Sequence, residues 1–344
     1  MNWNIEVLKK IMLLLENKLD NAKTDDEVFM IQDDLYTIKE MINCQEKGKV
    51  FEIPDAKNYH IIDNKRYEEN KEFLVASAKK NFCKLNRYAS CRLSHTMYIP
   101  RKMSFIELLG YIEKFLLSYD IRMYETYKNL SLYSRISIGR DYYKCGNSAI
   151  ANGILNKITT TGDVFIYSRF IHNLKTAATL PHELAHANQF QYVYDPQKIQ
   201  IMRYSTFSES YAIFIEYIFG AYMQKTPFQR NALDFNRDMI DTAIGHIDYN
   251  YSYDDIKAFD IKKVYSNLLA FYWVALYEYE PKLAVQDINW FNQNYGILTD
   301  EEILNHYGFD NLSNGLGETI NNYIRRRKNI WYNNYIRMVK NKWH

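Results

Sequence analysis

The sequence predicts a mainly α-helical protein with one small β-sheet. Its 344 residues include only 12 glycines and 6 prolines, a composition that favours long helices over a turn-rich β fold. Most of the chain repeats apolar residues at helical spacing. Residues 132–138 and 163–168 are instead short, β-branched and aromatic, as strands are.

The first part of the chain predicts helices. Ile5, Leu8 and Met12 share one face of an amphipathic helix expected over residues 4–19. A capping box at residues 24–27 predicts a second helix to about residue 44, so that the two helices should form an antiparallel hairpin. After a connector at residues 48–64, helices are expected over residues 67–88 and, following a second capping box at residues 104–107, to about residue 119.

Helical patterns resume after the second predicted strand. We expect helices over residues 206–220, 229–247 and 256–279, the last of which should end near Pro281. Residues 299–302 form a third capping box, and residues 318–342 should form the final helix.

Composition and charge exclude several classes of function. A net charge of +2 gives no electrostatic footprint for nucleic acid. No apolar run is long enough to span a membrane, and charged residues interrupt any signal-peptide pattern near the N-terminus. The four cysteines form no C-x-x-C pair and no disulfide framework. We therefore expect a cytoplasmic protein with reduced thiols and without nucleic-acid or membrane partners, and the sequence leaves its oligomeric state open.

The most specific signal lies in residues 179–189, where His182, Glu183 and His186 form the pattern H-E-x-x-H. On a helix, residues four apart share a face, so the two histidines can offer imidazole nitrogens to one metal ion. Glu183 projects beside that face, where a carboxylate can take a proton from a metal-bound water. Chance gives roughly 0.01 such patterns in a chain of this composition. Two imidazoles with one carboxylate suit zinc and leave a fourth position for water.

Pro181 limits where the helix that carries this motif can begin. Proline is tolerated in the first turn of a helix but disrupts its interior. We therefore expect Thr176 or Thr179 to be the N-cap, whereas an earlier start predicts a kink near Pro181.

A third ligand is expected from residues 206–220, which are apolar on nearly all sides and should be buried. Glu209 and Glu216 interrupt this segment and, being two turns apart, share one face. A buried carboxylate needs a metal or a partner. We interpret Glu209 as the metal ligand, with Glu216 orienting a histidine or binding in place of Glu209. Alternatively, one or both acids pair with a nearby lysine or arginine.

Residues 171–186 and 207–216 together resemble the M3 metallopeptidases, the group of thimet oligopeptidase and oligoendopeptidase F. Members carry an H-E-x-G-H-x-x-H helix and a second helix that supplies a glutamate ligand. The resemblance covers about residues 163–220. Ala185 and Gln189 depart from the family pattern, which has glycine and histidine at these positions.

The resemblance implies a zincin-like (gluzincin) helical fold with the small sheet beside the active-site helix. One zinc ion per chain would be bound by His182, His186 and Glu209, and Glu183 would be the general base. The family also uses a histidine and tyrosines from a late segment to stabilise the developing oxyanion. His246 and Tyr265 are the candidates here, and a structural role is the alternative for each.

The resemblance further implies peptidase activity on short peptides, held in a cleft between helical halves. Residues 1–130 would then be an N-terminal helical region, either a lid or half of the cleft, and residues 131–344 the zincin-like catalytic region. We hypothesise that residues 164–168 are an edge strand that pairs with the substrate backbone, with an ordinary sheet as the alternative.

Two other functions remain open at the level of sequence. A non-catalytic binding or scaffold protein can keep a gluzincin-like fold, and the chain is shorter than typical M3 members. A host-directed metalloprotease with a narrow protein substrate is a further possibility. The intact H-E-x-x-H favours the peptidase, because a scaffold has no need of the general base.

Overall fold

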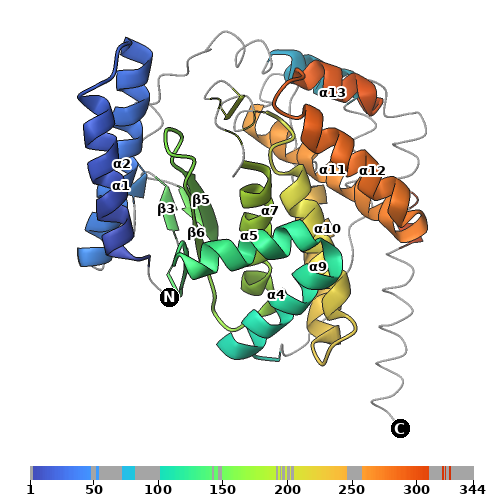
Figure 1. Cartoon of the computed structure of the whole chain (residues 1–344). Helices are drawn as coiled ribbons and strands as arrows, with labels where there is room; N and C mark the ends of the chain where they lie inside the picture. The colour runs from blue at the N-terminus through green and yellow to red at the C-terminus, as the bar shows by residue number, and fades with distance from the viewer. Residues whose placement is uncertain are drawn as a thin grey trace. The chain divides into compact units, whose positions relative to one another are not determined.

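The structure is a computed structural model that describes residues 3–47, 52–53, 72–81, 101–141, 143–145, 149–190, 205–245 and 258–309, with isolated positions elsewhere. Helices predominate and the strands are short, as predicted (Figure 1). The chain divides into two compact units, the first comprising Met1–Ile62 and Lys102–Gln200, the second Asp63–Arg101 and Ile201–His344. The predicted boundary near residue 130 falls in helix α5 (Ile121–Leu132) of the first unit, and the roles assigned to its two sides stay a prediction.

The N-terminal hairpin of the first unit consists of α1 (Ile5–Leu19) and α2 (Asp25–Lys47), as predicted (Figure 1). The Asn4 side chain caps α1 by accepting hydrogen bonds from the amides of Glu6 and Val7. The facing apolar side chains of the two helices form a buried cluster with residues of the neighbouring sheet. Its members include Leu8, Ile11, Leu15, Leu35, Ile38, Ile158 and Phe165.

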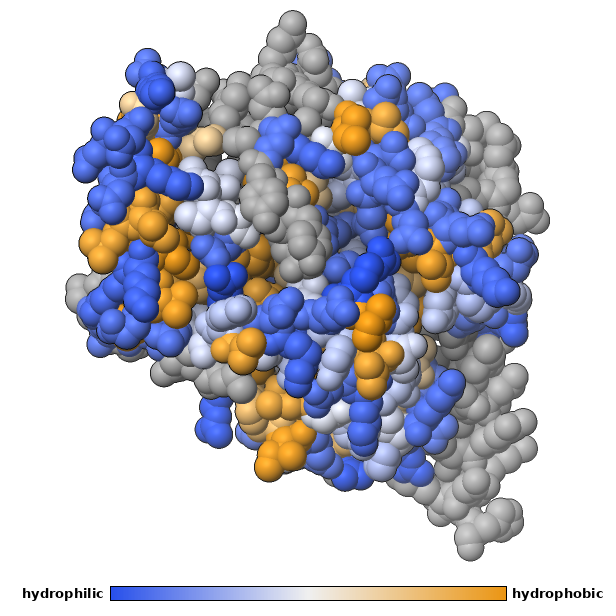
Figure 2. Space-filling view, viewed as in Figure 1, coloured by the Kyte–Doolittle hydropathy of each residue, from blue (hydrophilic) through white to orange (hydrophobic). Residues whose placement is uncertain are grey.

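The outer face of this hairpin keeps some apolar side chains at the surface. Leu13 and Leu14 are each 56% exposed, and Tyr36 is 43% exposed. Figure 2 shows orange atoms over α1 and α2, bordered by hydrophilic residues. No helix among the described residues combines the length and apolar character needed to cross a membrane.

A three-stranded sheet lies beside the hairpin, in the order β2-β6-β5. The central strand β6 (Val164–Arg169) is parallel to β2 (Ile136–Gly139) and antiparallel to β5 (Gly153–Lys157). In this register, Ile166 pairs with Ile136 of β2 on one side and with Leu155 of β5 on the other. The two predicted strands are therefore confirmed, but the hypothesis that residues 164–168 form an edge strand is wrong, because β6 is paired on both sides.

The two faces of this sheet carry different helices. Ile154 packs against the α1–α2 cluster, and helix α7 (Thr179–Phe190) packs against β5 and β6. Successive residues of a strand point to opposite faces, so Gly153 and Leu155 point toward α7. α5 also contacts α7, and it follows α4 (Phe105–Tyr119), whose predicted capping box at Ser104 is present. A second small sheet contains β1 (Glu52–Ile53), β3 (Tyr143–Cys145) and β4 (Ala149–Ala151).

The start of the motif helix differs from the expectation. A short helix α6 (Leu174–Ala177) precedes α7, and Asn173 caps it by accepting a hydrogen bond from the amide of Thr176 at 2.9 Å. Ala178 separates the two helices, and Thr179 is already the first residue of α7. The prediction that Thr176 or Thr179 is the N-cap is therefore wrong. The helical path begins earlier, and the break before Thr179 leaves Pro181 in the first turn of α7, where proline is tolerated.

The second unit is built around α9 (Ser210–Met223), which packs against α10 (Gln229–Gly245) and α11 (Ala258–Tyr279). Its core is aromatic, and it holds most of the largest fully buried side chains of the described structure. They are Phe207, Phe214, Tyr217, Phe219, Phe228, Tyr265, Phe271, Trp273 and Tyr295.

The C-terminal helices extend this unit. α12 (Pro281–Asn294) was not predicted, and it starts with Pro281 in its first turn. α13 (Asp300–His306) follows the predicted capping box at Thr299, and residues 72–81 form a helix within the predicted range 67–88. The helix expected over residues 318–342 lies almost entirely outside the described residues.

Asp34 ties the hairpin to the sheet. This carboxylate is 3% exposed and accepts hydrogen bonds from the amides of Thr159 and Thr160 at 2.9 and 2.8 Å. It also accepts one from the Thr160 hydroxyl at 2.5 Å. These residues lie in the turn between β5 and β6, so one side chain of α2 fixes the end of the two strands on which α7 packs.

Replacing Asp34 by alanine should lower the free energy of unfolding by about 2–4 kcal/mol, because two backbone amides lose a charged acceptor in a buried turn. Urea denaturation followed by circular dichroism measures the change. The exposed neighbour Gln32 gives the control, since Gln32→Ala should change stability by less than about 0.5 kcal/mol. Equal stability of the two variants would contradict the role given to Asp34.

Candidate metal centre

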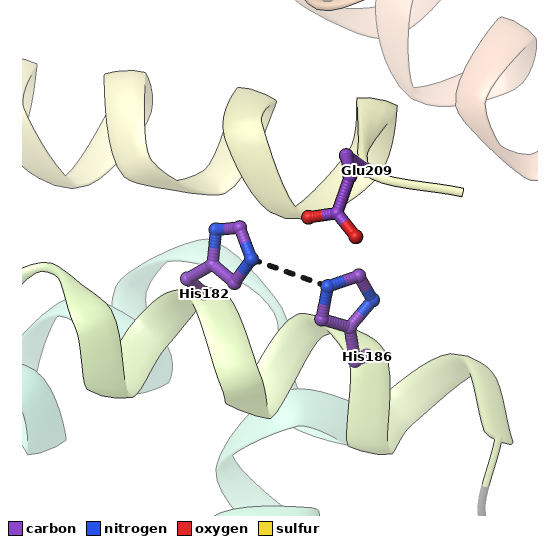
Figure 3. Close-up of side chains that lie close together, drawn as sticks. All are labelled: His182, His186 and Glu209. Carbon is purple, nitrogen blue, oxygen red and sulfur yellow. Dashed lines mark hydrogen bonds between the residues drawn. The ribbon is translucent and has the colours of Figure 1, made fainter. Parts of the chain in front are cut away.

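Two imidazole rings lie together on one face of α7. His182 and His186 are one helical turn apart, and their Nε2 atoms are 3.2 Å from each other (Figure 3). The ring centroids are 4.9 Å apart and the rings are inclined by 75°. His186 is only 9% exposed. The motif therefore presents both nitrogens toward one point, as the spacing predicted.

Glu209 supplies the carboxylate at this point. It directly precedes α9 and holds the N-cap position of that helix. One ligand atom from each of His182, His186 and Glu209 lies within 4.8 Å of the others, and Figure 3 shows the carboxylate directed at the two rings. These three residues, which the sequence predicted as the ligand set, are therefore a group that can hold a metal ion.

The geometry of this group suits zinc. Ligand nitrogens at about 2.05 Å from a zinc ion, with a tetrahedral angle between them, lie roughly 3.3 Å apart. The Nε2 atoms of His182 and His186, at 3.2 Å, have this separation. Two imidazoles and one carboxylate also match the donor set of catalytic zinc sites, which keep one position for water or substrate.

Glu183 lies on the side of α7 that faces β5. It is 5% exposed, and its carboxylate lies next to the main chain of Gly153. A Cβ atom at position 153 would lie 2.5 Å from Glu183 Oε1 and 2.5 Å from the Thr179 methyl carbon. A side chain at this position would have to displace Glu183 or Thr179, so the absence of one lets β5 pass directly beside the expected general base. Gly153 was not predicted as part of the site, although an isolated glycine next to a short apolar run signals close backbone approach.

Glu216 is the other acid weighed as a ligand. It lies within α9 and is partly buried. Among the described residues, the group around the two histidines contains Glu209 and does not contain Glu216. The preference for Glu209 therefore agrees with the geometry, and an orienting role for Glu216 stays a prediction.

Of the two candidates for oxyanion stabilisation, Tyr265 lies among the described residues. Tyr265 is fully buried in the second unit, where its hydroxyl lies 2.9 Å from the Ser77 hydroxyl and its ring packs edge-on against Phe207 and Phe309. Burial raises the pKa of the Tyr265 hydroxyl, which therefore stays protonated. A structural role accounts for these contacts, and its catalytic role stays a prediction. His246 lies outside the described residues.

Three solved structures are similar to this chain. The chain aligns with a protein assigned as an oligoendopeptidase F from Bacillus anthracis strain Ames at a TM-score of 0.51, with 12% identity over 94% of this chain. A second protein assigned as an oligoendopeptidase F aligns at 0.47 with 12% identity over 89% of this chain, covering 65% of its own. PZ peptidase A with an inhibitor aligns at 0.49 with 13% identity over 90% of this chain, covering 66% of its own. The sequence matches no family model and no curated protein.

The chain therefore shares the fold of the Bacillus anthracis protein. The predicted fold class, mainly α with a small sheet beside the motif helix, is confirmed. The chain spans 65% of the length of the Bacillus anthracis protein, and 12% identity is a likeness of fold alone. The chemistry has to be argued from the residues of this chain.

Loss of a ligand should remove the metal. We expect the purified protein to hold one zinc per chain, and His182→Ala, His186→Ala or Glu209→Ala to weaken zinc binding by more than about 100-fold. The reason is that even the loss of a residue that only orients a metal ligand lowers metal affinity by about 10- to 100-fold. The loss of a ligand itself should therefore have a larger effect. Competition with a fluorescent chelator measures affinity, and elemental analysis measures content. His306→Ala removes an exposed histidine outside the group and should bind zinc as the wild type does. Wild-type affinity in all three ligand variants would exclude this site.

Proposed function

We propose that this protein is a zinc-dependent peptidase that hydrolyses peptide bonds in short peptides. The observation that carries the proposal is the meeting of His182, His186 and Glu209 at one point, with Glu183 next to it on α7. The proposal includes one zinc ion per chain, a cytoplasmic location, and no nucleic-acid or membrane partner.

A zinc ion held there would polarise the scissile carbonyl and lower the pKa of a bound water to about 7. Glu183 is not one of the three ligand residues, so its role is proton transfer. It accepts the proton of the attacking water and passes this proton to the leaving amine. Its burial against Gly153 holds the carboxylate in one place beside the ligand face.

Substrate binding is proposed at the free edge of β5. Among the described strands, β5 pairs only with β6, so its other edge carries no strand partner. Gly153 places this strand beside Glu183. An extended peptide added along β5 by main-chain hydrogen bonds would bring its own backbone near the general base. β5 thus takes the role that the sequence analysis gave to residues 164–168.

The alternative is a binding or scaffold protein that keeps the fold without the reaction. Three ligand residues suffice to hold a metal. A scaffold has no need of a fourth ionisable side chain, Glu183, beside the ligands, where β5 has a glycine next to it. Short peptides are proposed as the substrates because a similar solved structure is assigned as an oligoendopeptidase.

Glu183→Gln tests the reaction itself. The variant should bind zinc with unchanged affinity and lose at least about 100-fold in kcat/KM, because general acid–base groups contribute about 10²–10⁴. A library of short quenched fluorescent peptides measures hydrolysis. Glu125→Gln makes the same exchange at an exposed position of α5 and should leave the activity unchanged. Full activity in Glu183→Gln would refute the peptidase proposal, and zinc without cleavage in the wild type would favour the scaffold.

Backbone N-methylation of a cleaved peptide tests the β5 edge. A strand donates main-chain hydrogen bonds to one neighbour from alternate residues. Methylation at alternate positions should therefore raise KM by about 3- to 10-fold, the effect of one lost hydrogen bond, and the positions between should tolerate it. An alanine series over the same positions reports side-chain recognition separately. Equal KM values for peptides methylated at successive positions would rule out strand addition.

A further inference from the structure

Asp300 is a buried carboxylate that binds the segment before Glu209. It is the first residue of α13 and is 2% exposed. Its Oδ1 atom accepts a hydrogen bond from the Ser205 hydroxyl at 2.7 Å, and its Oδ2 atom accepts one from the Thr206 amide at 2.7 Å. One carboxylate thus binds the side chain of one residue and the main chain of the next, far away in the sequence.

Further hydrogen bonds fix the same turn. The Ser205 hydroxyl accepts from the amide of Phe207 at 3.1 Å, and the Ser266 hydroxyl of α11 donates to the Thr206 carbonyl at 2.6 Å. The amide of Ser208 donates to the Ser205 carbonyl at 3.2 Å. Side chains from α11 and α13 therefore hold the main chain on both sides of Thr206.

Ring packing completes the support of this turn. Phe207 is fully buried, stacks on Phe309 with 6.1 Å between centroids, and meets the edge of Tyr265. Tyr295 is also buried, and its hydroxyl donates to the Met202 carbonyl. The turn has little freedom to move while these contacts remain.

The position of Glu209 follows from this turn. Glu209 begins the first hydrogen-bonded turn of α9, with its carbonyl accepting from the amide of Ile213 at 2.9 Å. Its side chain makes no capping hydrogen bond to α9. Glu209 directly follows residues 205–208, so a shift of these residues would move its main chain and, with it, the point from which its carboxylate extends. Metal–ligand distances tolerate only about 0.2 Å of error, so a shift of the turn would misplace the ligand.

We infer that Asp300 is a positioning residue for Glu209 and, by holding residues 205–207, sets the affinity of the metal centre. This inference rests on the proposed metal site and names a determinant of that site outside its ligands. Residues that orient metal ligands typically contribute 10- to 100-fold to metal affinity.

The test is zinc affinity, measured by chelator competition on the full chain. Asp300→Asn keeps the shape, but its amide nitrogen cannot accept the hydrogen bond from the Ser205 hydroxyl, and the Thr206 amide loses its carboxylate acceptor. It should weaken zinc binding by about 10- to 100-fold, with an unchanged circular dichroism spectrum. Glu301→Gln makes the same change of charge at the next, exposed residue of α13 and should bind zinc as the wild type does.

A double-mutant cycle separates positioning from a general structural effect. In the Glu209→Ala background, Asp300→Asn should cause no further loss of zinc affinity, because the ligand it positions is gone. An equal loss in both backgrounds would overturn the inference, as would wild-type affinity in folded Asp300→Asn. If Asp300→Asn does not fold, Ser205→Ala takes its place in the cycle and the same outcomes decide.

The peptidase proposal can be refuted without refuting the role of Asp300. A wild type that binds zinc but cleaves no peptide refutes the peptidase and leaves the cycle decisive for Asp300. A wild type that binds no zinc overturns both.

Discussion

The metal centre depends on a face of α7 that is held in one orientation. His182 and His186 are one turn apart, so their relative placement follows from helix geometry alone. The orientation of that face follows from the packing of α7 on β5 and β6, where Gly153 permits close contact with Glu183. The sheet is fixed in turn by the α1–α2 hairpin, through the shared apolar cluster and through Asp34. Segments of the first unit that are distant in the sequence thus together fix the orientation of α7.

The ligand carboxylate and the expected general base have separate supports. Glu183 depends on the absence of a side chain at Gly153, and Glu209 depends on the turn that Asp300 holds. Metal binding and proton transfer are therefore open to separate change. A substitution beside Glu183 should lower kcat without changing metal affinity. A substitution at Asp300 should instead lower metal affinity. This separation is what makes the two roles distinguishable by experiment.

Local patterns made part of the site predictable. The H-E-x-x-H spacing and the capping boxes at Ser104 and Thr299 are four- or five-residue signals, and each was found in the expected helix. Strand order depends on distant pairing, so β6 was predicted as a strand but not as the central one. Pro281 was interpreted as the end of a helix, although proline is equally suited to the first turn of the next. Asp300 looked like an ordinary acid in a first turn, because nothing local shows that its carboxylate binds Ser205.

The burial of Glu183 bears on whether this fold serves a reaction or only binds a metal. Burial of a carboxylate is unfavourable unless its interactions compensate, and the glycine opposite it adds conformational entropy to the unfolded chain. A metal-binding scaffold needs only a ligand set, which His182, His186 and Glu209 already supply. A peptidase needs in addition a proton acceptor beside the ligands, and Glu183 is such a group. The placement of Glu183 beside Gly153 is therefore the feature on which the proposed reaction, as distinct from metal binding alone, depends.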